Sequence, residues 1–154
     1  MTLVMILGSS CSLALPNLSI FAAAGAKPAI DEICHKFQEK YGITVEASYG
    51  GGGEVLSQMM LSRSGDVYLA PEQRFMEMAA EKQAIDPETI RSVAYTIPVI
   101  GEMQVAISAY SQNEKSAQRF LDLITSAESK AAFKQMGYLV YNEEVKEYRP
   151  WNPH

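Results

Sequence analysis

Three short apolar segments, each followed by a helix-like pattern, constrain the fold of this chain more than any other feature of the sequence. The segments are residues 18–22, 44–48 and 66–69, and apolar residues recur at helical spacing in the stretches that follow them. Alternation of this kind predicts a parallel sheet whose strands are joined by right-handed helical crossovers. At 154 residues the chain is long enough to bury one core of ordinary size. The sequence therefore predicts a single α/β unit.

The second half of the chain departs from this alternation. Residues 92–100 and 103–109 both have an extended pattern, and Gly101-Glu102 separates them. A Gly-Glu pair can form a tight hairpin, because glycine adopts a positive φ without strain. We therefore expect two further strands that run in opposite directions.

Two helices are expected after these strands. Ser111 or Asn113 can cap the first, and Ser126 can cap the second, which Gly137 would end. The residues expected to face inward on the first are Ala117, Phe120, Leu121 and Ile124, and on the second Ala131, Phe133 and Met136.

The glycine run Gly50–Gly53 lies between a strand-like and a helix-like stretch. Such a run lets the backbone approach a ligand closely, and the following helix directs N–H groups and its dipole at an anion. The alternative is a tight turn that only tolerates glycine, and the glycines alone do not separate the two interpretations. A second small-residue turn, 23–26, follows the first strand. In an open parallel sheet both turns fall on one rim, which favours an anion site.

The net charge limits which partners the chain can have. Thirteen Lys and Arg residues stand against 18 Asp and Glu, which gives a net charge of −5. Nucleic-acid phosphates require a basic face, so we expect no nucleic-acid partner. Any bound anion must be held by local dipoles and hydrogen bonds, because the overall charge repels it.

No group of residues predicts catalysis or a metal centre. Cys34 and His35 are neighbours that face different directions on a helix, and His154 is far away in the sequence. The glycine run lacks the Gly-Lys-Ser/Thr of a P-loop. Glu54 and Asp66 are candidate acid–base groups, but a first-turn helix residue and a strand-start residue are the simpler interpretations. We expect no enzymatic activity, no metal and no other cofactor.

Residues 1–14 are interpreted as an atypical signal peptide. Residues 2–7 are apolar, and Ser12 and Ala14 fit the small-x-small pattern of a signal-peptidase site. No Lys or Arg precedes Lys27, so the usual positive charge is missing. The apolar stretch is too short to span a bilayer. We expect a periplasmic or otherwise exported protein, with an irregular tail at residues 142–154.

Several segments of the chain match one known family when they are taken together. They are Ile20–Gly25 with Pro28-Ala-Ile, Ser48–Glu54 with Gln58, Gly65–Ala70 with Met76 and Ala79, and Phe133–Tyr138. Together they resemble the periplasmic molybdate-binding proteins, the solute receptors of molybdate and tungstate ABC transporters. The resemblance extends from residue 17 to about residue 140. It implies that residues 15–141 form one three-layer α/β/α lobe of a type II periplasmic binding protein, with a mainly parallel sheet and an added antiparallel strand.

The resemblance also implies a ligand, a site and a partner. The ligand would be a small inorganic oxyanion such as molybdate or tungstate, and the partner an ABC transporter membrane subunit. The N–H donors of the site would come from Ala24, Gly25, Ala26, Gly52 and Gly53 of this chain. The family commonly has serine hydroxyls where this chain has Gly25 and one of Gly52 or Gly53. Each missing charge-assisted hydrogen bond removes about 1.5–3 kcal/mol of interaction.

A second departure from the family concerns its second lobe. In the family, residues like 97–100 lead into that lobe and residues like 103–109 return from it, whereas here Gly101-Glu102 takes its place. An alternative function follows, in which a lobe unable to bind ligand forms a homodimer or pairs with a separate second lobe. The residues considered for such a contact are Tyr95, Ile97, Val99 and Val105, with ordinary core packing as the competing interpretation. The sequence leaves the identity of the oxyanion open.

Overall fold

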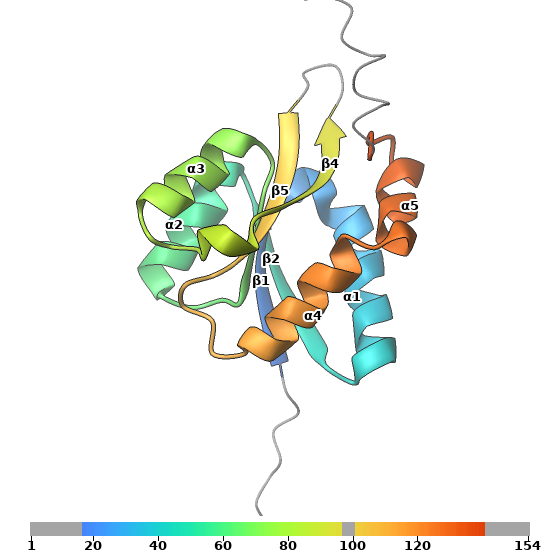
Figure 1. The fold of residues 1–154 in the computed structure, drawn as a ribbon, viewed down its shortest axis with the longest axis horizontal. Helices are drawn as coiled ribbons and strands as arrows, with labels where there is room; N and C mark the ends of the chain where they lie inside the picture. The colour runs from blue at the N-terminus through green and yellow to red at the C-terminus, as the bar shows by residue number, and fades with distance from the viewer. Residues whose placement is uncertain (1–16, 97–100, 141–154) are drawn as a thin grey trace, which may run out of the picture.

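A five-stranded mixed sheet with the order β2-β1-β3-β5-β4 organises the fold (Figure 1). The computed structural model describes residues 17–96 and 101–140. The strands are β1 (Asn17–Ala23), β2 (Thr44–Gly50), β3 (Val67–Ala70), β4 (Arg91–Thr96) and β5 (Gly101–Ile107). β1 pairs in parallel with β2 and β3, whereas β5 lies antiparallel between β3 and β4. The predicted mainly parallel sheet with an added antiparallel strand is confirmed.

Helices cover both faces of the sheet (Figure 1). One face carries α1 (Lys27–Tyr41), α4 (Glu114–Ile124) and α5 (Ala127–Gln135), and the other carries α2 (Gly52–Ser62) and α3 (Gln73–Glu81). Two short 3-10 helices, η1 (Ala24–Ala26) and η2 (Pro87–Thr89), complete the described elements. The predicted three-layer α/β/α arrangement is confirmed.

The alternation of side chains along β1 creates two cores. Leu18, Ile20 and Ala22 pack into the cluster under α1, α4 and α5, whereas Phe21 joins the cluster under α2 and α3. Successive strand residues point to opposite faces of a sheet, so one central strand supplies apolar side chains to both helical layers.

The ends of α5 agree with the sequence, but part of its inward face does not, and the N-cap of α4, Asn113, makes no side-chain cap hydrogen bond. Ser126 Oγ accepts a hydrogen bond from the N–H of Ser129, and Gly137 follows α5 with a φ of 85°. The predicted cap and stop are confirmed. Ala131 and Met136 were expected to face inward, but both are exposed. Ser129, Ala132 and Phe133 form the buried face instead, because these positions recur at the i, i+3, i+4 spacing of one helix face.

The expected hairpin at Gly101-Glu102 is wrong in its position. Both residues belong to β5, where Gly101 pairs with Thr96 and Glu102 with Tyr95. Gly101 extends the ladder because its N–H donates to Thr96 Oγ1 at 3.2 Å. The connection from β4 to β5 therefore falls on residues 97–100, which lie outside the described residues, as do residues 1–14 and 142–154. The assignments of a signal peptide, a replaced lobe and a tail stay predictions.

A buried carboxylate holds the amino end of the parallel strands together. Asp66 is 4% exposed and accepts hydrogen bonds from the N–H of Ser19 at 2.9 Å and from Ser111 Oγ at 2.7 Å. The N–H of Gln112 and Nδ2 of Asn113 also donate to it. Buried charges require this degree of satisfaction. Asp66 thus joins β1, β3 and the loop before α4, which agrees with the structural interpretation of this residue.

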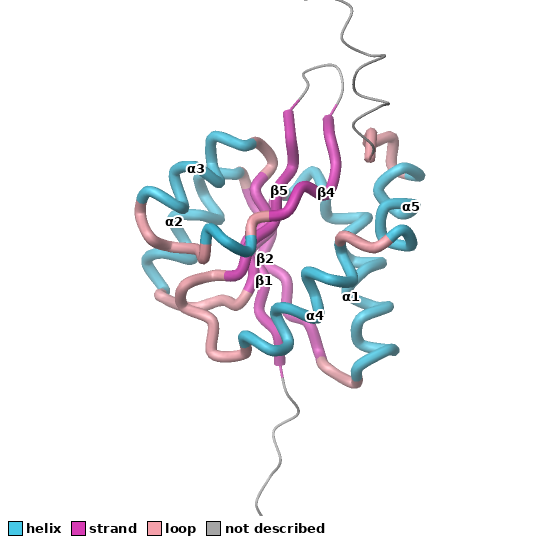
Figure 2. Tube along the Cα trace, in the orientation of Figure 1, coloured by secondary structure: helices cyan, strands magenta, loops and turns pink. Residues whose placement is uncertain are grey.

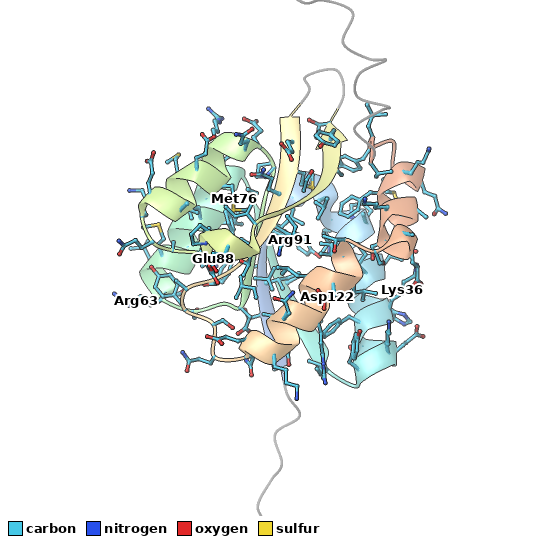
Figure 3. The ribbon with its side chains drawn as sticks, in the orientation of Figure 1. Lys36, Arg63, Met76, Glu88, Arg91 and Asp122 are labelled. Atoms are coloured by element: carbon cyan, nitrogen blue, oxygen red, sulfur yellow. The ribbon has the colours of Figure 1, made fainter. Side chains whose placement is uncertain are left out.

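Replacing the Asp66 carboxylate by an amide tests this network. We expect Asp66→Asn to lower the free energy of unfolding by about 1.5–3 kcal/mol, because an amide presents one acceptor oxygen and turns two donors toward existing donors. The measurement is urea denaturation of the full chain. Asp122→Asn is the matched control, since Asp122 lies exposed on α4 (Figure 3) and should change stability by less than about 0.5 kcal/mol. Equal effects of the two substitutions would contradict this role of Asp66.

Candidate functional site

The carboxyl ends of β1, β2 and β3 meet along one edge of the sheet, called here the rim. Ala23 of β1 pairs with Gly50 of β2, and Ala22 pairs with Leu69 of β3. Neighbouring strands lie about 4.8 Å apart, so the segments that follow Ala23 and Gly50 start side by side. β4 runs in the same direction as β1, and Figure 2 shows the ends of β4 and β5 reaching beyond the helices. The rim therefore gathers η1, the start of α2, the end of β4 and the start of β5.

The first turn at the rim is η1, which leads directly into α1. Ala24 and Gly25 are exposed, whereas Ala26 is fully buried. Lys27 N–H donates to the Ala24 carbonyl, so the intrahelical bonding starts there. Because the first N–H groups of a helix have no intrahelical partner, Ala24 and Gly25 carry the accessible donors of this turn.

The second turn at the rim is the start of α2. The helix begins at Gly52, inside the glycine run, with Gly51 as its N-cap. The first helical hydrogen bond runs from Val55 N–H to the Gly51 carbonyl at 3.0 Å. The N–H groups of Gly52 and Gly53 therefore precede the regular bonding and are directed out of the helix end. The two turns proposed from the sequence do lie on one rim.

The glycines at the rim lack side chains for different reasons. A Cβ on Gly52 would lie 2.6 Å from the Phe75 ring and 2.7 Å from Pro71, so close packing against α3 requires glycine there. A Cβ on Gly53 would lie 3.4 Å from Phe75, and one on Gly25 would lie 3.7 Å from the Tyr138 hydroxyl. These are ordinary contacts, so Gly25 and Gly53 leave room above the backbone. Packing explains Gly52, and an open backbone surface remains at the other two.

Acidic side chains stand close to the second turn. Glu54 Oε2 accepts a hydrogen bond from the N–H of Gly51 at 3.1 Å and so neutralises part of the helix end. Glu72 follows β3, lies beside Gly101 at the start of β5, and its carboxylate pairs with Arg74 at 2.9 Å. An anion at the second turn would therefore gain from backbone dipoles while it meets the Glu54 carboxylate, and the Glu72 charge at the rim is balanced by Arg74.

A polar cluster flanks the rim on the β2 side. Lys27 Nζ lies 2.8 Å from Asp31 Oδ2 and 4.5 Å from the centre of the Tyr49 ring, and the Tyr49 hydroxyl donates to Asp31 Oδ1 at 2.6 Å. The hydrogen bonds from Lys27 and Tyr49 lower the pKa of Asp31. Burial, with the Asp31 bond, raises the pKa of Tyr49, so its hydroxyl stays a donor. The Lys27 charge is thus paired with the Asp31 carboxylate, so it does not act on η1 as an unpaired positive charge.

The surroundings of Cys34 and His35, the other residues considered for chemistry, do not favour a chemical role. Burial raises the pKa of the Cys34 thiol to about 12, which leaves almost no thiolate at neutral pH. His35 is exposed and lies 3.5 Å from Glu39 on the same helix. Within the described residues no group of three or more His, Cys, Asp or Glu side chains is placed to hold a metal ion.

The structure describes two of the four residues considered for an assembly contact. Val105 is fully buried in the core, and the backbone of Tyr95 pairs with Leu139. Ile97 and Val99 lie outside the described residues. Core packing therefore accounts for Val105, as the competing interpretation held.

A separate cavity lies at the opposite end of the sheet. It measures about 480 Å³ and lies between η2, the end of β5 and the start of α4. Thr89, Ser108 and Lys115 are among its lining residues. The sequence pattern points to the carboxyl ends of the strands and contains no signal for this cavity.

Comparison with known proteins gives the family of the chain. Residues 18–101, more than half of its length, match the family of bacterial extracellular solute-binding proteins. The chain belongs to this family. Among curated solute-binding relatives, the molybdate-binding protein ModA of Escherichia coli is 28% identical over 73 residues, 47% of this chain and 28% of its own length. A Haemophilus influenzae protein that carries the name of a binding protein is 27% identical over 107 residues, 70% of this chain and 43% of that one. The chain thus spans less than half the length of these relatives.

Solved structures of solute-binding proteins share the fold. The periplasmic molybdate-binding protein of Azotobacter vinelandii aligns with a TM-score of 0.75 at 10% identity and covers 81% of this chain and 100% of its own. The sulfate-binding protein SubI of Mycobacterium tuberculosis aligns with a TM-score of 0.69 at 8% identity, over 90% of this chain and 92% of its own. The predicted resemblance to molybdate-type binding proteins is confirmed. In residues 17–96 and 101–140, none of the helices combines the length and apolar character needed to cross a bilayer.

The packing difference between the two glycines of the solute-binding lobe can be measured. We expect Gly52→Ala to lower the free energy of unfolding by about 1–3 kcal/mol, because the new Cβ overlaps Phe75 and Pro71. Gly53→Ala is the matched control at the next residue, and we expect it to be neutral or to stabilise by up to about 1 kcal/mol, since alanine favours the helix. Urea denaturation of both variants gives the comparison. Equal stabilities would show that Phe75 does not restrict position 52.

The reactivity of Cys34 tests its burial. With a pKa of about 12, the thiol should react with a thiolate-specific disulfide reagent at pH 8 about a thousandfold more slowly than an ordinary cysteine. The experiment uses the full chain with Cys11→Ser, which leaves Cys34 as its single thiol. The same protein in urea is the control, where the reaction should be fast. Cys34 is half-buried, and equal rates with and without urea would contradict its raised pKa.

Proposed function

We propose that this lobe binds a tetrahedral oxyanion of the molybdate or tungstate type as part of an exported solute-binding protein of an ABC transporter. The donors are backbone N–H groups of Ala24, Gly25 and Ala26 in the first turn, and of Gly52 and Gly53 in the second. The exposed groups of Ala24 and Gly25 contribute most, because Ala26 is buried. The observation that carries the proposal is the pairing of Ala23 with Gly50, which starts both turns side by side at the rim.

The chemistry of the donors supports an oxyanion rather than a neutral solute. Backbone N–H groups at a helix start bear partial positive charge, and hydrogen bonds to a charged oxygen are about twice as strong as neutral ones. α1 and α2 both begin at the rim, so two helix dipoles add at one place. The name of the Escherichia coli relative and that of the Azotobacter vinelandii structure agree with molybdate.

The proposal includes a surface that faces the rim. The described donors approach an anion from one side only, so the oxygens on its far side need hydrogen bonds from elsewhere or from water. A second lobe of a longer protein, a separately encoded lobe or a second copy of this chain would supply them. Closure of two lobes on a ligand is the signal that a transporter membrane subunit reads.

Calorimetric titration tests the binding. The full chain is titrated at low salt with sodium molybdate, tungstate and sulfate in turn. We expect molybdate or tungstate to bind with a Kd below about 100 µM, which corresponds to about −5.5 kcal/mol. The difference between the three anions identifies the preferred one. The absence of heat for all three would refute binding by this chain alone.

Charge substitution at Gly25 places the site. Gly25→Asp puts a carboxylate beside the N–H donors in a position with room for a side chain. We expect it to weaken oxyanion binding at least tenfold by repulsion. Gly25→Asn is the matched neutral control and should bind within about threefold of the unchanged chain, because the side chain has the same size. Equal affinities of the two variants would place the anion elsewhere.

A further inference from the structure

A short segment after α5, residues 137–139 and called here the strap, leads the chain back toward the rim. Gly137 has a φ of 85° and directs its N–H to the Lys134 carbonyl at 3.0 Å. Tyr138 N–H reaches the Phe133 carbonyl at 3.2 Å. This pair of bonds is a Schellman ending, which needs the left-handed conformation that glycine adopts freely. The ending sets the direction in which Tyr138 and Leu139 leave α5.

Backbone hydrogen bonds to β4 hold the strap at Leu139. Leu139 and Tyr95 exchange two backbone hydrogen bonds, with N–O distances of 3.1 and 2.7 Å. The rings of Phe133 and Tyr138 meet edge to face, with centroids 5.8 Å apart and an angle of 86° between the planes. Tyr138 is therefore held through its backbone, its neighbour and its ring, and its hydroxyl has a defined position.

The Tyr138 hydroxyl donates a hydrogen bond to the carbonyl of Gly25, with an O–O distance of 2.7 Å. Burial raises the pKa of Tyr138, so the hydroxyl keeps its proton in neutral solution. In the described part of the chain no other side-chain hydrogen bond is found at residues 24–26. Gly25 is exposed and, as a glycine, has the largest backbone freedom to lose. One long-range bond thus restrains the most flexible residue of η1.

We propose that Tyr138 is a positioning residue of the oxyanion site, because its bond to Gly25 holds the Ala24 and Gly25 N–H groups in the binding geometry before the anion arrives. This inference rests on the proposed function. A turn that is ordered in advance loses less conformational entropy on binding, so the affinity is higher. Fixing the Gly25 carbonyl restricts rotation about the Gly25 Cα–C bond, and this limits how far the Gly25 N–H can turn relative to the rest of η1.

The test compares molybdate affinity, by calorimetry, in variants of the full chain. Tyr138→Phe removes the hydroxyl and keeps the ring against Phe133. We expect it to weaken molybdate binding about three- to tenfold, as the loss of one hydrogen bond implies. Tyr110→Phe is the matched control at the opposite end of the sheet, where the same change should leave the affinity unaltered. Unchanged affinity in Tyr138→Phe would overturn the proposal.

A rescue separates positioning from a general loss of structure. Gly25→Ala restricts the backbone of the turn without the hydroxyl, and its Cβ fits at 3.7 Å from the Tyr138 oxygen. Gly25→Ala in the Tyr138→Phe background should therefore restore the affinity to within about twofold of the unchanged chain. If the double variant stays as weak as Tyr138→Phe, Tyr138 acts in another way and the proposal fails.

Amide hydrogen exchange distinguishes this failure from failure of the proposed function. Tyr138→Phe should accelerate exchange of the Lys27 N–H, which donates to the Ala24 carbonyl in this turn, at least fivefold while residues of α4 keep their rates. Fast local exchange together with no molybdate heat in the unchanged chain would refute the oxyanion site and leave Tyr138 as a restraint on the turn alone. Unchanged exchange at Lys27 would overturn the positioning role whatever the calorimetry gives.

Discussion

The position of β1 is the constraint on which the rest of the structure depends. It is hydrogen-bonded to β2 on one side and to β3 on the other, and it contributes side chains to both cores. A slip of one residue would turn Leu18 and Ile20 toward α2 and α3 and would place Phe21 under α1. The same slip would move η1 by about 3.3 Å along the rim relative to Gly50. The register that buries the core therefore also sets the two turns side by side.

Polar groups have different hydrogen-bond partners at the two ends of the parallel strands. At the amino end, Asp66 receives hydrogen bonds from Ser19, Ser111 and Gln112, and its charge is satisfied internally. At the rim, the helix starts leave N–H donors directed outward. The end with satisfied groups gives stability, whereas the other end retains donors that an external group can use.

Local patterns predicted most of the fold, since strand alternation, helix periodicity and glycine stops act between near neighbours in the sequence. The inward face of α5 was mistaken because a short helix with three alanines has a weak apolar pattern. Two contacts at the rim had no sequence signal. Phe75 packs on Gly52, and Tyr138 reaches Gly25 from 113 residues away. Both contacts depend on how two separate elements pack against each other, and the sequence pattern within either element does not contain that information.

The charge around the rim limits what this lobe can do by itself. Glu54 stands at the second turn, Lys27 is paired with Asp31 and Arg74 is paired with Glu72, so the proposed oxyanion site depends mainly on backbone dipoles. Dipoles lose strength quickly when water competes for the anion, because a high dielectric screens them. An opposing surface that excludes water would strengthen the same N–H groups without adding a cation. The affinity of the lobe should therefore depend on closure more strongly than that of a site built on lysine or arginine, which fits a receptor that releases its ligand when it opens.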